Sequence, residues 1–527
     1  MGLFENFPYT NFHRVNMDWI LQIVKSLEPV PAELEELKNY IEENFPEAVQ
    51  EAFDKAVQDG TLSDILKEEL VFVTPQMYGA KGDGVNDDTE AIQAAIDSGK
   101  PVVFPAASYL VHATNDHDSA ISARSGSYMI FQDALIVLAA TAAAAYQIIN
   151  IGDVSDVVLT GRCTLRGDRL IHIGSSGEHG MGLNIWQSSR VSVDGIQVEN
   201  CWGDGIYINK SSDITVRECQ AINNRRNNIS IIAGENLLLE RCNVKNANGT
   251  NPQAGIGVEA NNATDPLTNC VIRDCTSSGN TGASLYITCR ADDSNVRVEG
   301  GSYDSRPGST FLSGSGVIEY NGCRIECGTA EIFSVDNVPL GSFVKFTNCE
   351  LYGGSSIIRH AGGSGSVLHG LIVKDCISYN ANLSRLGTWL TYGNGTVSGN
   401  VLELLMVNPT VTGFTSNVFL DPENTCCIKT AVPMKAASRM DYIISTNIWV
   451  YPAAANDLVI RNINDNTFQE NTEVLITNMG TNRGYVDSTS GSNFYWSDSS
   501  NVRSFPLDPG QTVAVLRLGG RLRIRMV

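Results

Sequence analysis

The feature that most constrains this chain is a repeat of 23 residues in its middle third. Segments with the same polar-then-apolar pattern start at Ser188, Ser211 and Gly234. A second apolar strand in each repeat starts at Leu183, Ile206, Ile229, Ile256 and Leu285, with later steps of 27 and 29 residues. A constant spacing of this size is typical of a solenoid, in which each repeat forms one coil that stacks on its neighbours. We therefore predict a mainly β solenoid, and we interpret the longer steps as insertions at turns.

Cysteines recur at one position of this repeat. An apolar residue, two polar residues and a cysteine follow one another in six places, which end at Cys219, Cys242, Cys275, Cys323, Cys349 and Cys376. Stacking puts these thiols above one another inside the tube, where a small buried thiol packs well. We interpret them as reduced core residues, with disulfides between neighbouring coils as the alternative. Their spacing matches no metal-ligand pattern, so we expect neither a metal nor another cofactor.

The composition divides the chain into three regions. Residues 1–70 are rich in Glu, Leu, Lys and Ala, and their apolar residues recur at helical steps. This apolar stripe is narrow, which favours an α-helical oligomeric stalk over a hairpin packed on its own chain. Residues 71–400 carry the coils. Residues 401–527 alternate apolar and polar side chains in separate strands, which predicts a C-terminal β-sandwich that joins three chains into a homotrimer.

The segment YGAKGDGVNDDTEAIQAAI, from Tyr78 to Ile96, resembles the opening segment of the pectate-lyase-like superfamily. That family folds as a right-handed parallel β-helix, which phage tailspikes also use, and the resemblance implies that a helix caps the first coil. The residues agree with this locally. Asp88 can cap a helix that starts near Thr89, and Ile92 and Ala95 lie on its buried face together with Ile96.

The segment FPYTNFHRVNMDWIL, from Phe7 to Leu21, looks like the amino-terminal attachment region of structural proteins from phages of Gram-positive bacteria. This resemblance implies that the protein is a virion component of the tail or its appendages, made in the host cytoplasm. It also implies that this region docks to other tail or collar proteins. The expected docking residues are Phe7, Tyr9, Phe12 and Trp19.

Charge and hydropathy exclude some other partners. The formal net charge is −21, with 37 Lys and Arg against 58 Asp and Glu, so the clustered basic residues that bind nucleic acid are not expected. No apolar run reaches the roughly 18 residues of a membrane span. The first residues also lack the basic start and apolar middle of a secretion signal.

Side chains alternate along a strand, so the outer face of the coils can be read from the sequence. Where Ile206 and Ile208 face the core, Tyr207 and Asn209 face outward. The same two columns contain other rings and polar groups, and the adjoining turns add two arginines. Rings that stack on sugars, with polar groups for their hydroxyls, predict polysaccharide binding by Trp186, Trp202, Tyr207, Arg225, Arg226 and Tyr286.

Glycoside hydrolysis needs two carboxyl groups at a defined separation. Asp204 and Glu259 form the best pair, two coils apart on this face. The alternative cluster is Glu178 and His179 with Asp168 and Arg169, in which His179 acts as the base and the arginine binds an acidic sugar. Two less specific readings stay open. Asp204 stands between two glycines and can equally satisfy backbone N–H groups of a turn, and Arg225 and Arg226 can be solvated turn charges.

Together these patterns predict a phage tail spike that attaches the virion to host surface polysaccharide, with depolymerisation by hydrolysis as the accompanying activity. One alternative is an adhesive tail fibre that binds cell-wall glycan without cutting it. The other is a secreted bacterial polysaccharide lyase or epimerase, which the phage-like first residues disfavour.

Overall fold

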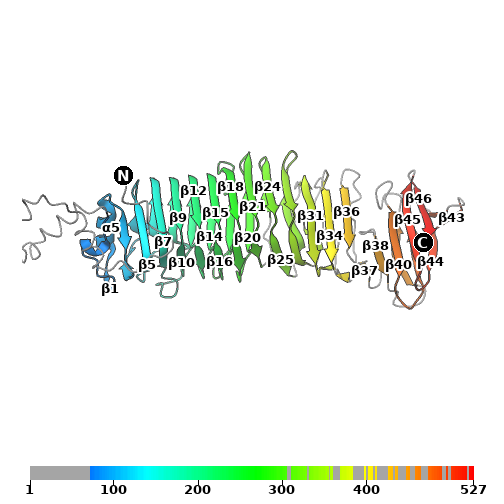
Figure 1. The fold of residues 1–527 in the computed structure, drawn as a ribbon, viewed down its shortest axis with the longest axis horizontal. Coiled ribbons are helices and arrows are strands. Elements are labelled where there is room, and N and C mark those ends of the chain that lie inside the picture. Colours follow the sequence, from blue (N-terminus) through cyan, green and yellow to red (C-terminus); the bar gives the residue numbers. More distant parts are fainter. Residues whose placement is uncertain are drawn as a thin grey trace, which may run out of the picture.

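The computed structural model describes residues 72–304 without interruption and separate stretches of the chain beyond them (Figure 1). These stretches are 310–328, 331–354, 356–359, 368–383, 397–398, 401–407, 410–411, 425–430, 434–436, 447–450, 457–463, 473–488, 494–496, 500–518 and 521–527. The expected helical region, with Phe7, Tyr9, Phe12 and Trp19, lies outside the described residues. No helix of the described part is long and apolar enough to cross a membrane.

The predicted parallel solenoid is confirmed. Its strands stack along an elongated rod (Figure 1), and one face is a ten-stranded parallel sheet. From its first coil the sheet contains β4 (Asp118–Ser122), β6 (Ala145–Gly152), β8 (His179–Trp186), β11 (Ile206–Asn209), β14 (Ile229–Ile231), β17 (Ile256–Glu259), β20 (Leu285–Cys289), β23 (Thr310–Leu312), β26 (Glu331–Asn337) and β29 (Ser356–Arg359). The register follows the repeat, because Ile206 pairs with Leu183 on one side and with Ile229 on the other.

Two further rows of parallel strands complete the coils. One row contains β9 (Ser189–Asp194), β12 (Ser211–Arg217), β15 (Gly234–Glu240), β18 (Leu267–Arg273) and β21 (Ser294–Glu299). The other contains β10 (Ile196–Glu199), β13 (Gln220–Ile222), β16 (Asn243–Lys245), β19 (Thr276–Ser278) and β22 (Ser302–Tyr303). In the coils before the repeat, the long strands β5 (Tyr128–Leu138) and β7 (Ser155–Arg166) run along both rows.

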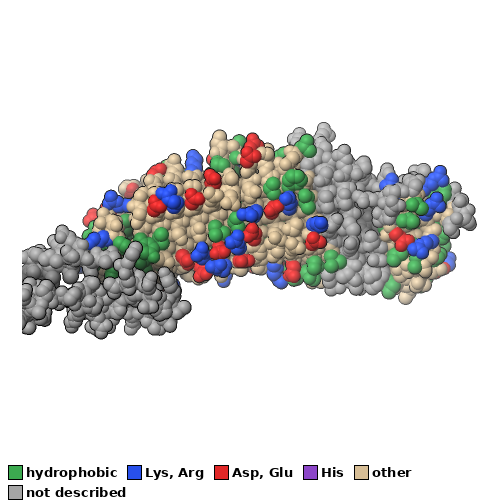
Figure 2. Space-filling model, turned by 45° about the horizontal axis from the view of Figure 1, so that its top comes forward, with side chains coloured by type: hydrophobic (Ala, Val, Ile, Leu, Met, Phe, Trp, Pro, Cys, Tyr) green, Lys and Arg blue, Asp and Glu red, His purple; other side chains and the backbone are tan. Residues whose placement is uncertain are grey.

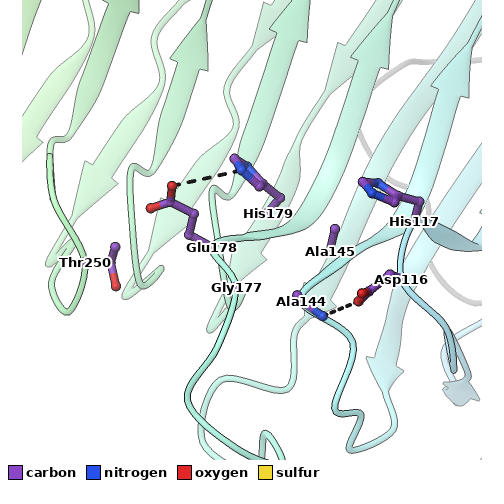
Figure 3. Close-up of a pocket in the computed structure, with 8 residues that line it drawn as sticks. All are labelled: Asp116, His117, Ala144, Ala145, Gly177, Glu178, His179 and Thr250. Atoms are coloured by element: carbon purple, nitrogen blue, oxygen red, sulfur yellow. Dashed lines mark hydrogen bonds and ion pairs between the residues drawn. The ribbon is translucent and has the colours of Figure 1, made fainter.

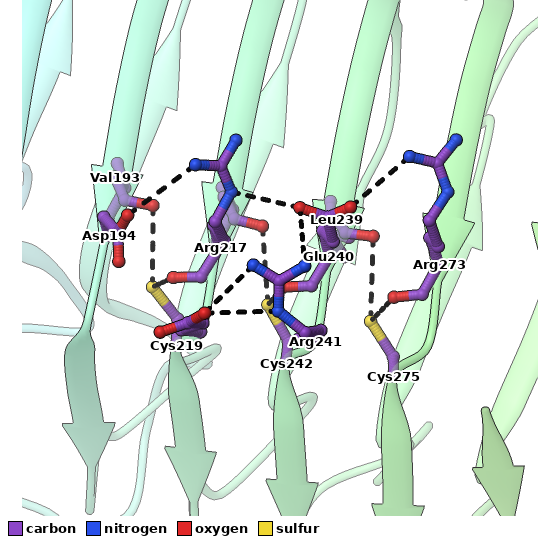
Figure 4. A network of polar contacts seen from close by, with 12 residues as sticks. Val193, Asp194, Arg217, Cys219, Leu239, Glu240, Arg241, Cys242, Arg273 and Cys275 are labelled. Carbon is purple, nitrogen blue, oxygen red and sulfur yellow. Dashed lines mark hydrogen bonds and ion pairs between the residues drawn. The ribbon is translucent and has the colours of Figure 1, made fainter. Parts of the chain in front are cut away.

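The cysteine column lies inside the tube, as predicted. All cysteines whose side chains are described are buried and free, so the disulfide alternative is wrong for these residues. Each thiol of the column contacts a backbone carbonyl of the preceding coil, for example Cys275 Sγ and Leu239 O at 3.7 Å (Figure 4). Because the thiols are buried, reagents in solution cannot reach them, and they act as packing groups.

Ion pairs cover the outside of the same strands. Glu240 accepts hydrogen bonds from Arg217 at 3.1 Å and from Arg273 at 3.3 Å, which joins three coils (Figure 4). Acidic and basic side chains lie beside one another along the solenoid surface (Figure 2). Exposed pairs of this kind contribute at most about 1 kcal/mol each. The apolar columns inside the tube therefore carry most of the stability.

The corner after β10, β13 and β16 is built from asparagines in the left-handed conformation. Asn200, Asn223 and Asn246 have φ of 54°, 56° and 59°. Asparagine visits this region more readily than other residues with a side chain. The Asn223 amide donates to Asn200 Oδ1, which joins the asparagine side chains of neighbouring coils. This corner carries the turns that lead into the ten-stranded sheet.

Helix α5 (Thr89–Asp97) lies at the first coil, where the sequence placed it. Ile92, Ala95 and Ile96 form its buried face. Asp88 occupies the position before the helix, but its carboxylate makes no capping bond there. It accepts instead from the backbone N–H groups of Lys81 and Gly82 at 2.5 and 3.0 Å, which ties the glycine-rich loop to the helix.

The predicted domain boundary at residue 400 is corrected by the strand pairing. β34 (Val401–Val407) pairs in parallel with β31 (Leu371–Tyr379), and β36 (Thr425–Thr430) pairs in parallel with β34. β37 (Met434–Ala436), β38 (Asn447–Val450) and β40 (Glu473–Asn478) are also parallel neighbours. Antiparallel pairing joins β40 to β45 (Thr512–Leu518) and β45 to β46 (Arg521–Met526). The solenoid thus continues past residue 400, while the sandwich remains a prediction.

Candidate functional site

The candidate site lies where turns of the corner meet the outer face of the ten-stranded sheet. The turns 200–205 and 223–228 are short, whereas 167–178 and 246–255 are longer. The two longer turns contact each other, because Arg169 donates to Asn248 Oδ1 at 2.5 Å. Arg169 also donates to the carbonyl of Asn223. Arg169 therefore fastens turns together, which differs from the predicted role of binding an acidic sugar.

Four charged residues converge at the centre of this region. Arg226 Nη1 lies 2.9 Å from Asp204 Oδ2 and 3.1 Å from Glu259 Oε1, and its Nε lies 4.0 Å from Glu178 Oε2. The sequence placed Asp204 and Glu259 in one cluster and Glu178 in another. The structure joins both clusters through a single guanidinium group.

The three carboxylates differ in exposure. Asp204 is fully buried, whereas the side chains of Glu259 and Glu178 are 15% and 44% exposed. Desolvation raises the pKa of the Asp204 carboxyl, although Arg226 and the backbone N–H of Asn227 act in the opposite direction. Because a ligand cannot reach Asp204, its geometry fits the turn role: its Oδ1 accepts from Asn227 N at 2.8 Å. The two carboxylates within reach of a ligand are Glu259 and Glu178.

Glu259 is fixed by donors on both oxygens. Arg226 and the Asn227 amide donate to Oε1, at 3.1 and 3.3 Å, and the Tyr286 hydroxyl donates to Oε2. Tyr286 can lie there because its coil neighbour is Gly257, where an added Cβ would come within 2.8 Å of the tyrosine ring. Gly257 thus makes room for this ring.

Trp202 is not a surface ring, contrary to the prediction. Its indole stacks on His172 with ring centroids 3.8 Å apart, and its N–H donates to the Ser176 carbonyl at 2.9 Å. The Arg225 guanidinium lies 3.9 Å from the indole centroid and donates to the Gly177 carbonyl. The turn 167–178 folds over Trp202, so this residue and Arg225 position the turn that carries Glu178.

A buried polar cluster anchors the other end of this turn. Asp168 accepts from the Tyr146 hydroxyl at 2.7 Å, and its second oxygen lies 2.7 Å from His172 Nδ1. Asp168 and the His172 side chain are almost completely inaccessible. Asp168 was among the residues predicted to surround the catalytic candidates, whereas Tyr146 and His172 were not. In the sequence, the only sign of this cluster is that an aspartate and a histidine stand four residues apart.

Two adjoining cavities form a groove along the sheet. The cavity of about 500 Å³ beside Glu178 and His179 is also lined by Asp116, His117 and Thr250 (Figure 3). The second, of about 490 Å³, shares His117, Ala145 and His179 with the first. It extends to Trp186, which is 38% exposed, and to the half-buried Tyr207. Both rings lie in the groove where the sequence placed a sugar-binding surface.

Several residues of the groove escaped the sequence analysis. They come mainly from the coils before the repeat and include Asp116, His117, Ser119, Gln147 and Asn150. Strand pairing brings Asn150 into the predicted column of Tyr207, since Asn150 pairs with Asn184, which pairs with Tyr207. In the described part of the chain, no group of three or more His, Cys, Asp or Glu side chains is arranged to hold a metal ion.

Comparisons with known proteins agree with this architecture. Residues 111–302 match the family model for the right handed beta helix region, and residues 72–122 match the pectate lyase-like model of rhamnogalacturonase A/epimerase. The pre-neck appendage protein of Bacillus phage B103 is 23% identical over 291 residues, which cover 49% of this chain and 33% of that protein. A capsule KN3-specific depolymerase of Klebsiella phage KN3-1 is 27% identical over 180 residues, or 30% of this chain and 22% of that protein.

A third relative, the uncharacterized protein YclG of Bacillus subtilis, is 28% identical over 215 residues, which cover 34% of this chain and 37% of YclG. The chain therefore spans well under half the length of these curated relatives. Among solved structures, the tailspike protein of E. coli bacteriophage HK620 in complex with pentasaccharide has a TM-score of 0.52 at 15% identity. That match covers 88% of this chain and 93% of the other.

The family matches and the stacked coils define a right-handed parallel β-helix protein. Within that class the chain is similar over part of its length to a phage appendage protein and a phage depolymerase, and its fold is similar to that of a tailspike.

Proposed function

We propose that the protein is a virion tail appendage that binds a host surface polysaccharide along the groove and hydrolyses its glycosidic bonds. The observation that carries this proposal is the meeting of two accessible carboxylates, Glu178 and Glu259, on one arginine beside a groove lined by Trp186 and Tyr207. The names of the phage relatives, an appendage protein and a capsule depolymerase, support the same reading.

The contacts suggest a division of roles between the two acids. Glu259, held by Arg226 and Tyr286, is the carboxylate that takes the proton of the attacking water. Glu178 is the more exposed acid and lies 4.0 Å from His179, so it gives its proton to the leaving glycosidic oxygen. Water then adds to the anomeric carbon as the C–O bond breaks, and the two acids exchange their protonation states. Asp204 keeps Arg226 in place and does not touch the substrate.

The test uses the full-length chain and surface polysaccharide from candidate host bacteria, with new reducing ends as the readout. Glu259→Gln and Glu178→Gln should each lower product formation at least about 100-fold. Glu218→Gln is the matched control, because Glu218 pairs with Arg241 on another face and is 56% exposed. Full activity of Glu259→Gln would overturn the assignment. Unsaturated sugar ends would instead identify lyase chemistry.

One observation favours a second candidate, binding without cleavage. Glu259 is already engaged by three donors, and such a saturated carboxylate can serve to shape a binding surface. Tight glycan binding by the wild-type chain without any product would select this adhesive function. We also propose the homotrimer, which light scattering of the purified chain can test, and attachment to the virion through residues 1–70.

A further inference from the structure

The groove is notable for the charges that line it. Among the residues described for its two cavities there are two carboxylates, Asp116 and Glu178, and no lysine or arginine. The cavity toward Trp186 and Tyr207 is lined by amide, hydroxyl and apolar side chains with two imidazoles and contains no carboxylate. A ligand that lies along it therefore meets neutral polar groups at one end and negative charge at the other.

The neutral groups are arranged in pairs across neighbouring coils. Ser119 donates to Gln147 Oε1 at 2.9 Å, and the Asn184 amide donates to Asn150 Oδ1 at 2.7 Å. A side-chain amide offers two donor hydrogens and two acceptor positions, so each pair keeps capacity for a ligand. The strands repeat at about 4.8 Å, which presents donors and acceptors at regular steps along the groove. Such an array matches the hydroxyl and acetamido groups of sugars.

The arginines nearest the groove are engaged by other groups of the protein. Arg226 forms ion pairs with Asp204 and Glu259, and its Nε lies 4.0 Å from Glu178. Arg225 stacks on the Trp202 ring and donates to backbone carbonyls, and Arg169 binds asparagines of the turns. None of the three is among the residues that line the two cavities, so a polyanion in the groove would meet Asp116 and Glu178 without a lysine or arginine in the lining. Like charges brought together in this way select against a partner.

We infer that the groove accepts an uncharged segment of polysaccharide and discriminates against polymers with phosphate or uronate groups. This inference rests on the proposed function and specifies the substrate class of the same groove. It predicts that recognition depends on hydrogen bonds and ring stacking, with electrostatic attraction making no net contribution.

The experiment measures binding of the full-length chain to bacterial surface polysaccharides that anion exchange has separated into neutral and anionic fractions. Titrations are made at 50 and 500 mM NaCl. We expect binding to a neutral fraction, with a dissociation constant that changes less than about threefold over this range, because salt screens only charge interactions. Asn184→Ala should weaken that binding about tenfold, since a hydrogen-bonding amide is lost.

Asn269→Ala is the matched control. Asn269 lies in a similar amide ladder outside the groove, where it donates to Asn236 Oδ1 at 3.0 Å, so its removal should leave binding unchanged. Preferential binding to an anionic fraction that weakens steeply with salt would overturn the inference and leave the proposed function intact. Binding to no fraction at all would overturn both. Equal effects of Asn184→Ala and Asn269→Ala would show that the amides of the groove do not contact the glycan.

Discussion

Replacing Arg226 with methionine tests the idea that this arginine neutralises a buried carboxylate. The change removes the only cationic group that lies within 4 Å of the Asp204 carboxylate among the described residues, while the methionine keeps much of the packing volume. Asp204 is completely buried. Removing one partner of a buried ion pair typically costs about 3–5 kcal/mol. Because the Asn227 N–H still donates to Asp204, we expect the lower end, about 3 kcal/mol, or roughly a 100-fold change in the unfolding equilibrium constant.

The loss of stability in Arg226→Met should depend on pH in a defined direction. Burial already raises the pKa of Asp204 in the wild-type protein, and losing the attraction of Arg226 raises it further. A carboxyl group whose pKa is raised by folding stabilises the folded state when it is protonated, and this stabilisation is lost as pH rises through the folded-state pKa. The loss in free energy of unfolding caused by Arg226→Met should therefore be largest at neutral pH and should become smaller as the solution is acidified.

The assay is urea denaturation followed by intrinsic fluorescence, for wild type, Arg226→Met and the double variant Asp204→Asn/Arg226→Met. The amide of the double variant needs no counter-ion, so it should recover most of the lost free energy of unfolding. A loss below about 1 kcal/mol, or a double variant no more stable than the single one, would refute the reasoning. Both results would mean that the carboxylate is solvated or protonated in the wild-type chain.

Three further outcomes follow from the contacts. Trp186→Ala should weaken glycan binding at least about tenfold in the titrations above, because the exposed ring binds the glycan in the proposed function. Thermal stability should not change. Unchanged affinity would contradict this prediction. Gly257→Ala should cost about 1–3 kcal/mol and lower product formation, because the new Cβ displaces Tyr286 from Glu259; wild-type activity and stability would contradict the packing. The buried thiols, such as Cys242, should react with a disulfide reagent only after denaturation in guanidinium, and rapid labelling of the folded chain would contradict the cysteine column.

The sequence was sufficient to predict the middle of the solenoid because its coils have nearly constant length. Once Ile206 faces the core, the spacing of 23 residues places Tyr207 beside Asn184 and Ser230, which the strand pairing confirms. The same register brought Glu259 and Tyr286 close to the short turns with Asp204 and Arg226. The nearness of Asp204 and Glu259 was therefore predictable from the repeat, whereas the contacts of Arg226 and Tyr286 with these carboxylates were not.

Other parts of the site depend on side-chain contacts that do not recur from coil to coil. The turn 167–178 is an insertion, and nothing in its pattern shows that His172 stacks on Trp202. The boundary at residue 400 failed for a different reason. Apolar and polar side chains alternate with a period of two both in an outer strand of a parallel coil and in a strand of an antiparallel hairpin. The sequence of β34 therefore does not distinguish the two.

The longer turns that flank the short ones have a consequence for how such a protein can diversify. Their backbones leave the coil after one strand and return at the start of the next, so residues can be inserted or deleted there while the core columns keep their alignment. If the groove binds glycan as proposed, mutation of the turns 167–178 and 246–255 can change which sugars are recognised while the core columns stay the same. Exchanging these turns between related chains would then transfer the sugar specificity with them.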